Sequence, residues 1–109
     1  MITWDDFEKI DIRTGTITEV MDFPKAKKPA YQLTIDFGPL GTKRSSAQIT
    51  HHYTKEELVG RQVVAVTNFP PRQIANFFSE CLVLGVYDEN NQVILLQPDK
   101  TTGNGQRIG

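Results

Sequence analysis

The sequence has almost no cysteine and no long apolar run, and each absence excludes a class of protein. Cys81 is the single cysteine, so an internal disulfide and a cysteine-based metal cluster are both excluded. No segment approaches the roughly 20 apolar residues that span a membrane. Asp5 and Asp6 place acid near the N-terminus, where a secretory signal is basic and apolar. We therefore expect a cytoplasmic protein that does not insert into membranes.

Motifs for catalysis and for cofactor binding are also missing. The adjacent pair His51 and His52 cannot easily face one metal ion, and neither has a glutamate or cysteine partner at a zinc-like spacing. Ser79 is not part of a Gly-x-Ser-x-Gly elbow, and no glycine-rich phosphate loop occurs. Cys81 begins an apolar stretch, and no residue is assigned as the base that would activate its thiol. The sequence thus predicts no enzyme, no metal and no cofactor.

The charges nearly cancel, but they are unevenly distributed along the chain. Residues 25 to 82 hold eight basic and four acidic side chains, whereas residues 1 to 24 hold two basic and six acidic ones. A cationic middle attracts phosphate, although so small an excess is also typical of a solvated surface. The length of 109 residues suits one domain over residues 1–109, with a single core.

Two short helices are predicted from capping residues. Thr3 and Asp6 suit the start of a helix from Trp4 to Lys9. Thr54 and Glu57 form a capping box that begins one or two further helical turns. Neither helix is long enough to be stable by itself, so each needs a surface to pack on.

The rest of the chain has the pattern of strands. Apolar and polar residues alternate from Ile10 to Val20, where Gly15 is a possible bend or bulge, and again from Tyr31 to Phe37. Further strands are expected over residues 42–49, 62–67, 81–87 and 92–97. With a short helix between the third and fourth strands, this order predicts an all-β, five-stranded OB-fold barrel with an added N-terminal helix and a C-terminal strand extension.

The strands at 62–67 and 81–87 contain the best core candidates, and the segment between them is the best candidate for recognition. Pro70 and Pro71 prevent the connector from Asn68 to Glu80 from being an ordinary strand. The connector combines polar side chains with three phenylalanines. A polar and aromatic loop held by two buried strands suits a binding surface, whereas the alternative is that the phenylalanines only cap the core.

Three motifs carry a resemblance that covers nearly the whole chain. They are Asp11-Ile12-Arg13-Thr14-Gly15-Thr16-Ile17, then Ser45-Ser46-Ala47-Gln48-Ile49, and then Asn68-Phe69-Pro70-Pro71-Arg72 leading to Ser79-Glu80 and Leu82-Val83-Leu84. In this order they resemble the tRNA-binding domain that occurs alone or fused to some aminoacyl-tRNA synthetases, and within that family the CsaA-like, export-related chaperones. The resemblance implies an OB-fold homodimer that binds tRNA and unfolded or presecretory polypeptides. The alternative is a purely RNA-binding module without a chaperone role.

The candidate nucleic-acid contacts combine cations with polar side chains of the connector. Lysine and arginine pair with phosphate and position RNA without reading its sequence. Arg72 can also stack on a splayed base, whereas Asn68 and Ser79 can instead satisfy backbone groups of the loop. The candidates are Lys25, Lys27, Lys28, Lys43, Arg44, Asn68, Arg72 and Ser79.

Aromatic side chains of the connector are the candidates for peptide binding. Phe69, Phe77 and Phe78 can grip apolar peptide side chains or stack on bases, but packing in the core or in a dimer is the more common fate of phenylalanine. Adjacent residues of an extended chain face opposite ways. We therefore expect at least one of Phe77 and Phe78 to be exposed or at an interface.

The homodimer prediction has a physical basis at both ends of the chain. Trp4 and Phe7 share one face of a very short helix, and Val93 and Leu95 belong to a strand beyond a barrel that is already complete. Apolar side chains at such places need a partner surface. These four residues are the predicted dimer interface.

Overall fold

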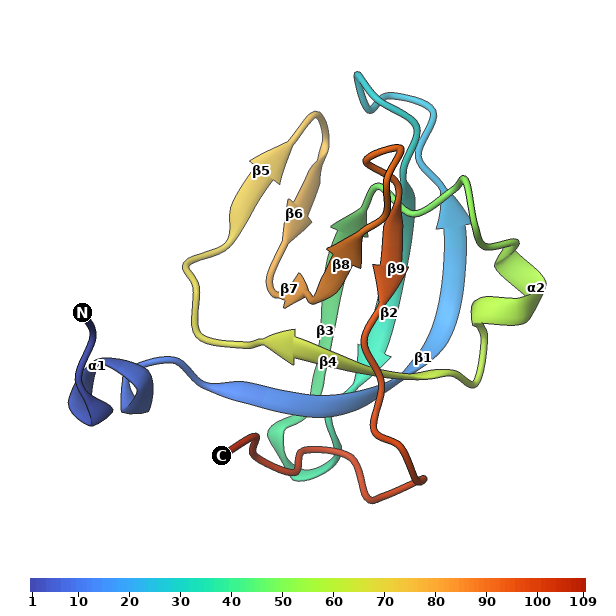
Figure 1. Cartoon of the computed structure of the whole chain (residues 1–109). Coiled ribbons are helices and arrows are strands. Elements are labelled where there is room, and N and C mark those ends of the chain that lie inside the picture. Colours follow the sequence, from blue (N-terminus) through green and yellow to red (C-terminus); the bar gives the residue numbers. More distant parts are fainter.

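The computed structural model describes residues 1–109 and is organised around a five-stranded antiparallel sheet that curls into a barrel (Figure 1). The strand order is β3-β2-β1-β4-β7. The strands are β1 (Ile12–Asp22), β2 (Tyr31–Asp36), β3 (Thr42–Ala47), β4 (Gln62–Val66) and β7 (Leu82–Val83). The prediction of an all-β OB-fold barrel is confirmed. No helix has the length and apolar character needed to cross a membrane.

Strand β1 is long enough to pair with two neighbours. Its residues 12–16 pair with β4 and its residues 16–22 pair with β2. The register shifts between Ile17 and Glu19, so the bulge lies there and not at Gly15, where the sequence suggested a bulge. Gly15 has a different role, because a Cβ atom there would lie 2.7 Å from Ile35 Cγ2 and 2.8 Å from the ring of Phe37.

Both predicted helix starts are present, and each has a capping box, which the sequence predicted only for the second helix. In α1 (Trp4–Glu8), Thr3 and Asp6 exchange side-chain and backbone hydrogen bonds, and in α2 (Lys55–Leu58) Thr54 and Glu57 do the same. The two helices differ in packing. Leu58 of α2 is fully buried in the barrel core, whereas α1 has no buried residue. A short 3-10 turn, η1 (Gly38–Leu40), connects β2 to β3.

The barrel closes between β3 and residues 79–81 by hydrogen bonds that include side chains. The Glu80 N–H donates to the Arg44 carbonyl (2.7 Å), and the Arg44 N–H donates to Glu80 Oε1 (2.9 Å). The Ser46 N–H donates to Ser79 Oγ (3.1 Å). The serines and the glutamate of the sequence motifs therefore join the two edges of the barrel.

Two predicted segments have a different structure from the one expected. The connector after Asn68 contains a hairpin of β5 (Arg72–Ile74) and β6 (Phe77–Ser79), because the prolines lie before it and not within it. The expected strand over residues 81–87 is split into β7 and β8 (Gly85–Tyr87). All three residues of β8 are exposed, so this stretch is not a fully buried core strand.

The C-terminal part of the chain is a hairpin followed by an ordered strap. Strand β9 (Val93–Leu95) pairs with β8, so the extension is a hairpin and not a lone strand (Figure 1). Residues 103–108 lie along β1: the Thr14 N–H donates to the Gln106 carbonyl (3.0 Å) and the Gly105 N–H donates to the Thr14 carbonyl (2.7 Å). We call residues 103–108 the C-terminal strap.

Candidate nucleic-acid interface

Three adjoining hollows form one groove beside the β5–β6 hairpin, and Ser46, Arg72 and Ile74 line all three. The lysine hollow, about 500 Å³, is bounded by the loop from Lys25 to Ala30. The apolar cleft, about 440 Å³, is lined by Phe69, Pro70, Ile74 and Leu82 together with Ser46, Arg72, Ser79 and Cys81. The wide hollow, about 960 Å³, extends from β3 toward the β8–β9 hairpin.

The groove is cationic. Lys25, Lys27, Lys28 and Arg72 all line the lysine hollow, and each is exposed. No aspartate or glutamate lines any of the three hollows. None of the four cations takes part in an ion pair of the chain. Four of the predicted nucleic-acid contacts are thus brought together, with their charges free for an external anion.

A small second core fixes the lysine loop against the hairpin. Phe23, Ala30 and Phe77 are buried together, and the ring centroids of Phe23 and Phe77 are 5.4 Å apart. Ile74 of β5 packs on the same cluster. The cluster explains why the lysines and Arg72, which are far apart in the sequence, line one hollow.

Phe77 is therefore unavailable to a ligand, which corrects its assignment as a peptide contact. Its side chain is only 3% exposed, whereas Phe78 is 58% exposed and Phe69 is 55% exposed. The expectation that at least one of Phe77 and Phe78 is exposed is confirmed, and the alternation of a strand is the reason. Phe69 lines the apolar cleft, and Phe78 does not.

Asn68 and Ser79 are occupied by the backbone of the chain. Asn68 Oδ1 accepts from the Asp11 N–H (3.0 Å), and Asn68 Nδ2 donates to the Lys9 carbonyl (2.8 Å). Ser79 Oγ accepts the Ser46 N–H in the barrel closure. Both side chains follow the alternative in which polar loop residues satisfy backbone groups.

The two cations of β3 do not line the groove. The Arg44 guanidinium lies 4.5 Å from the centroid of the Phe77 ring, and its Nη2 donates to Gln32 Oε1 (3.1 Å). Lys43 is half-buried. Adjacent strand residues face opposite ways, which separates these two from each other. The sequence alone could not show that the lysine loop packs on the β5–β6 hairpin through Phe23 and Ala30.

Cys81 lines the apolar cleft but is not a nucleophile. Burial raises the pKa of its thiol to about 11, although a hydrogen bond with Ser45 and the charge of Lys43 act in the opposite direction. The thiol is therefore protonated at neutral pH, and the reactive thiolate is scarce. Cys81 is thus a small buried residue of the cleft lining.

The predicted dimer residues have different environments. Trp4 is 84% exposed and Phe7 is half-buried, whereas Val93 is half-buried and lines the wide hollow. Leu95 belongs to the core of its own chain, so its side chain is not available to a partner, and the prediction is corrected at this position. The neighbouring Ile94 is exposed instead, as the alternation of β9 requires.

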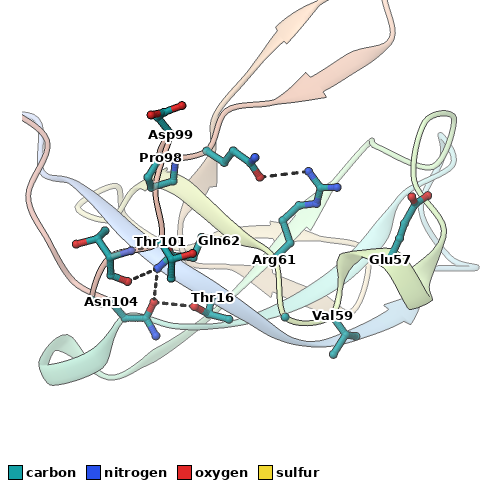
Figure 2. A pocket seen from close by; sticks show the side chains of 13 residues that line it. Thr16, Glu57, Val59, Arg61, Gln62, Pro98, Asp99, Thr101 and Asn104 are labelled. Carbon is teal, nitrogen blue, oxygen red and sulfur yellow. Dashed lines mark hydrogen bonds between the residues drawn. The ribbon is translucent and has the colours of Figure 1, made fainter.

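A further hollow of about 630 Å³ lies between α2, β4 and the segment leading to the C-terminal strap (Figure 2). Its lining holds Glu57 and Asp99 as well as Arg61, so the charges are mixed. Figure 2 shows Thr16 directed toward Asn104, and Thr16 Oγ donates to Asn104 Oδ1 (2.7 Å). The polar groups of this hollow hold the strap, and they favour no ligand of one charge.

Almost the whole chain matches one domain family, and the same stretch matches a part of longer curated proteins. Residues 12–107 match the family model described as "Putative tRNA binding domain". A methionine–tRNA ligase of Methanococcoides burtonii is 38% identical over 108 residues, which are 99% of this chain and 16% of that protein. The chain thus spans about one sixth of the length of such relatives.

Solved structures give a similarity over the full length. A crystal structure of chaperone CsaA from Bacillus anthracis is 50% identical with a TM-score of 0.95, and the match covers 100% of this chain and 99% of that one. The CsaA chaperone protein from Picrophilus torridus is 55% identical with a TM-score of 0.93, and both chains are fully covered. Because the family model matches residues 12–107, the chain belongs to the tRNA-binding-domain family, in which its similarity to the two chaperone structures makes it CsaA-like.

Proposed function

We propose that the chain binds tRNA through the lysine hollow. The observation that carries this proposal is the group of four exposed cations, Lys25, Lys27, Lys28 and Arg72, in a groove lined by no carboxylate. Such a site attracts a ligand with repeated negative charges, and an RNA backbone is one. The three lysines act as point charges, while the planar guanidinium can pair two phosphate oxygens at once.

Recognition of this kind depends on the shape and charge of the RNA and not on its sequence. Contacts to phosphates position the RNA, whereas base edges specify it. Arg72 is the one of the four cations that lines all three hollows, so a ligand in any of them lies beside its guanidinium. We infer a binding function without catalysis, in the cytoplasm.

A fluorescence titration of a tRNA transcript at several salt concentrations tests the proposal. The plot of log K against log salt has a negative slope, and each phosphate contact contributes about 0.7–0.9 to its magnitude. Replacing Lys25, Lys27 and Lys28 by glutamine should therefore reduce the magnitude of this slope by roughly two. The matched control replaces Lys9, Lys55 and Lys100, which lie outside the groove and change the net charge equally. Equal losses in both triple variants, or no binding at low salt, would contradict the proposal.

We also infer that a homodimer binds unfolded or presecretory polypeptides. The similarity to two proteins named as CsaA chaperones supports this inference, and so does the apolar part of the wide hollow, with Leu82, Val83, Tyr87 and Val93. Exposed Phe69 extends the apolar surface into the apolar cleft, whereas Phe78 is exposed outside the three hollows. Extended segments rich in apolar residues are the ligands that such a surface fits.

Suppression of aggregation of a chemically unfolded client protein tests this second function. Protection should occur near stoichiometric protein and should survive the triple lysine replacement, because apolar contacts carry it. If the protein gives no protection while tRNA binding is intact, the chain is a purely RNA-binding module.

A further inference from the structure

We propose that the apolar cleft holds one unpaired nucleobase of an RNA whose backbone occupies the lysine hollow. The proposal rests on the tRNA-binding function and adds what the site reads. A volume of about 440 Å³ lies within the range of small-ligand sites. Phe69 forms part of the lining and has more than half of its side-chain surface exposed, so its ring is open to stacking.

The cleft and the lysine hollow are neighbours. Ser46, Arg72 and Ile74 line both, so a base inside the cleft keeps its own phosphate close to the cations. Proteins recognise splayed-out bases by stacking on aromatic rings or on guanidinium planes. The cleft offers Phe69 and Arg72 for the two kinds of stacking.

Polar groups on the cleft lining favour a base over an aliphatic side chain. Neither the Ser46 hydroxyl nor the Arg72 guanidinium has a hydrogen-bond partner in the chain, although the Ser46 N–H and the Ser46 carbonyl do. A nucleobase edge carries donors and acceptors that can pair with both groups. A leucine or phenylalanine side chain of a peptide offers neither group a hydrogen bond, and it would cover the half-buried Ser46 hydroxyl without a partner, at a cost in desolvation.

Charge also selects the occupant. A peptide in the cleft would place a neutral backbone beside four unpaired cations, whereas an RNA strand places phosphates there. A fully paired duplex cannot fill the cleft, because its bases remain stacked in the helix. The site should therefore prefer RNA with an extruded or looped-out base over a continuous duplex.

Two RNA duplexes with equal numbers of phosphates test the proposal, one perfectly paired and one with a single bulged 2-aminopurine. The bulged duplex should bind about tenfold more tightly, in line with the value of one base stacked on an aromatic ring, and its fluorescence should change on binding. Phe69→Ala should abolish both the tighter binding of the bulged duplex and its fluorescence change. Phe69→Trp, which keeps an aromatic ring, should retain both. Phe78→Ala is the matched control, because Phe78 is as exposed as Phe69 but does not line the cleft.

Three other outcomes would overturn the proposal, and each identifies a different cause. If both duplexes bind equally in a salt-dependent way and Phe69→Ala changes neither, the backbone proposal stands and the base site does not exist. If neither duplex nor tRNA binds at low salt, both proposals fail. If an unfolded polypeptide displaces no bulged RNA but loses its own binding in Phe69→Ala, the cleft belongs to peptide side chains. Thermal unfolding of each variant separates these results from a loss of folding.

Discussion

Gly15 is packed too closely against the core for any side chain to replace its hydrogen. A Cβ atom at this position would approach Ile35 Cγ2 to 2.7 Å and Phe37 Cε1 to 2.8 Å, and both neighbours are fully buried. Neither can move without disturbing the interior of the barrel, which is packed at the density of a crystal. The glycine thus lets β1 approach β2 side chains in the core.

We expect Gly15→Ala to lower the free energy of unfolding by about 1–3 kcal/mol, the usual cost of overpacking a core. Urea unfolding followed by circular dichroism measures it. Gly103→Ala is the control, because its nearest neighbour is the flexible end of Gln106 at 3.3 Å, and its effect should be small. Equal stability of Gly15→Ala and the unaltered protein would show that the core relaxes freely.

Asp88 organises the turn of the β8–β9 hairpin. Its Oδ1 accepts from the backbone N–H groups of Gln92 (2.9 Å) and Asn90 (2.8 Å), and His52 Nε2 lies 2.7 Å from its Oδ2. The bond from Gln92 is the largest cause that lowers the pKa of Asp88, and the bond with His52 is the next. The ionised carboxylate of Asp88 therefore stabilises the folded state more than its protonated form does.

This lowered pKa predicts a pH dependence of stability. The contribution of Asp88 is complete above the ordinary aspartate pKa of about 3.9 and is lost as the pH falls through the lowered native pKa. The stability difference between the protein and Asp88→Asn should thus be constant near neutral pH and shrink below about pH 4. Urea unfolding across this range measures it. Asp99→Asn, at an exposed site, is the control, and a difference that stays constant in acid would refute the prediction.

Side chains that look functional in the sequence are partly structural, and local patterns alone do not separate the two. Asn68 and Ser79 have the residue types of ligand contacts, yet each satisfies backbone groups of a segment more than 30 residues away. Phe77 and Phe78 were both candidates, and alternation indicated that they differ without saying which is buried. Arg72 remains free because no partner reaches it.

At the scale of elements, local interactions were predictable and long-range ones were not. The capping residues of α1 and α2 and the alternation of β2 depend on neighbours in the sequence, so the sequence predicts them correctly. In β1 the expected alternation is wrong, because Thr14 and Gly15 are both buried and the register shifts between Ile17 and Glu19. The β5–β6 hairpin depends on a small core shared with the lysine loop, and the C-terminal strap depends on the free edge of β1. Neither partner is visible in a local pattern.

The closure between β3 and β6 depends strongly on Ser79, because a side-chain oxygen accepts the Ser46 N–H there, whereas a regular strand ladder uses backbone carbonyls. We expect Ser79→Ala to cost about 1–3 kcal/mol of stability, because the partly buried Ser46 N–H loses its acceptor. Ser79→Thr keeps the oxygen and should stay close to the unaltered protein. Thermal and urea unfolding measure the stability, and tRNA titration of the folded variant should give a nearly unchanged affinity. A large loss of affinity at full stability would instead make Ser79 a ligand contact.

At the scale of the whole molecule, several exposed apolar side chains lie on the β8–β9 hairpin and on the N-terminal helix. Val86, Tyr87 and Ile94 of the β8–β9 hairpin are each at least 42% exposed, and Trp4 is 84% exposed. Val86 and Ile94 are paired in the register and lie on one face of the hairpin, and exposed apolar side chains on one face are typical of a surface that contacts a partner. A second copy of the chain is the partner that we propose for them, since a stable interface needs roughly 800 Å² from each side.

The dimer prediction is tested by placing a charge on this face of the hairpin. Ile94→Lys should convert a dimer at micromolar concentration into a folded monomer, because a lysine without a partner is costly in an apolar interface. Sedimentation velocity measures the change, and circular dichroism confirms the fold of the variant. Leu40→Lys is the matched control, because Leu40 is exposed to a similar extent but lies on η1, outside the hairpin. A monomeric unaltered protein at tens of micromolar would exclude the homodimer, and equal dissociation in both variants would place the interface elsewhere.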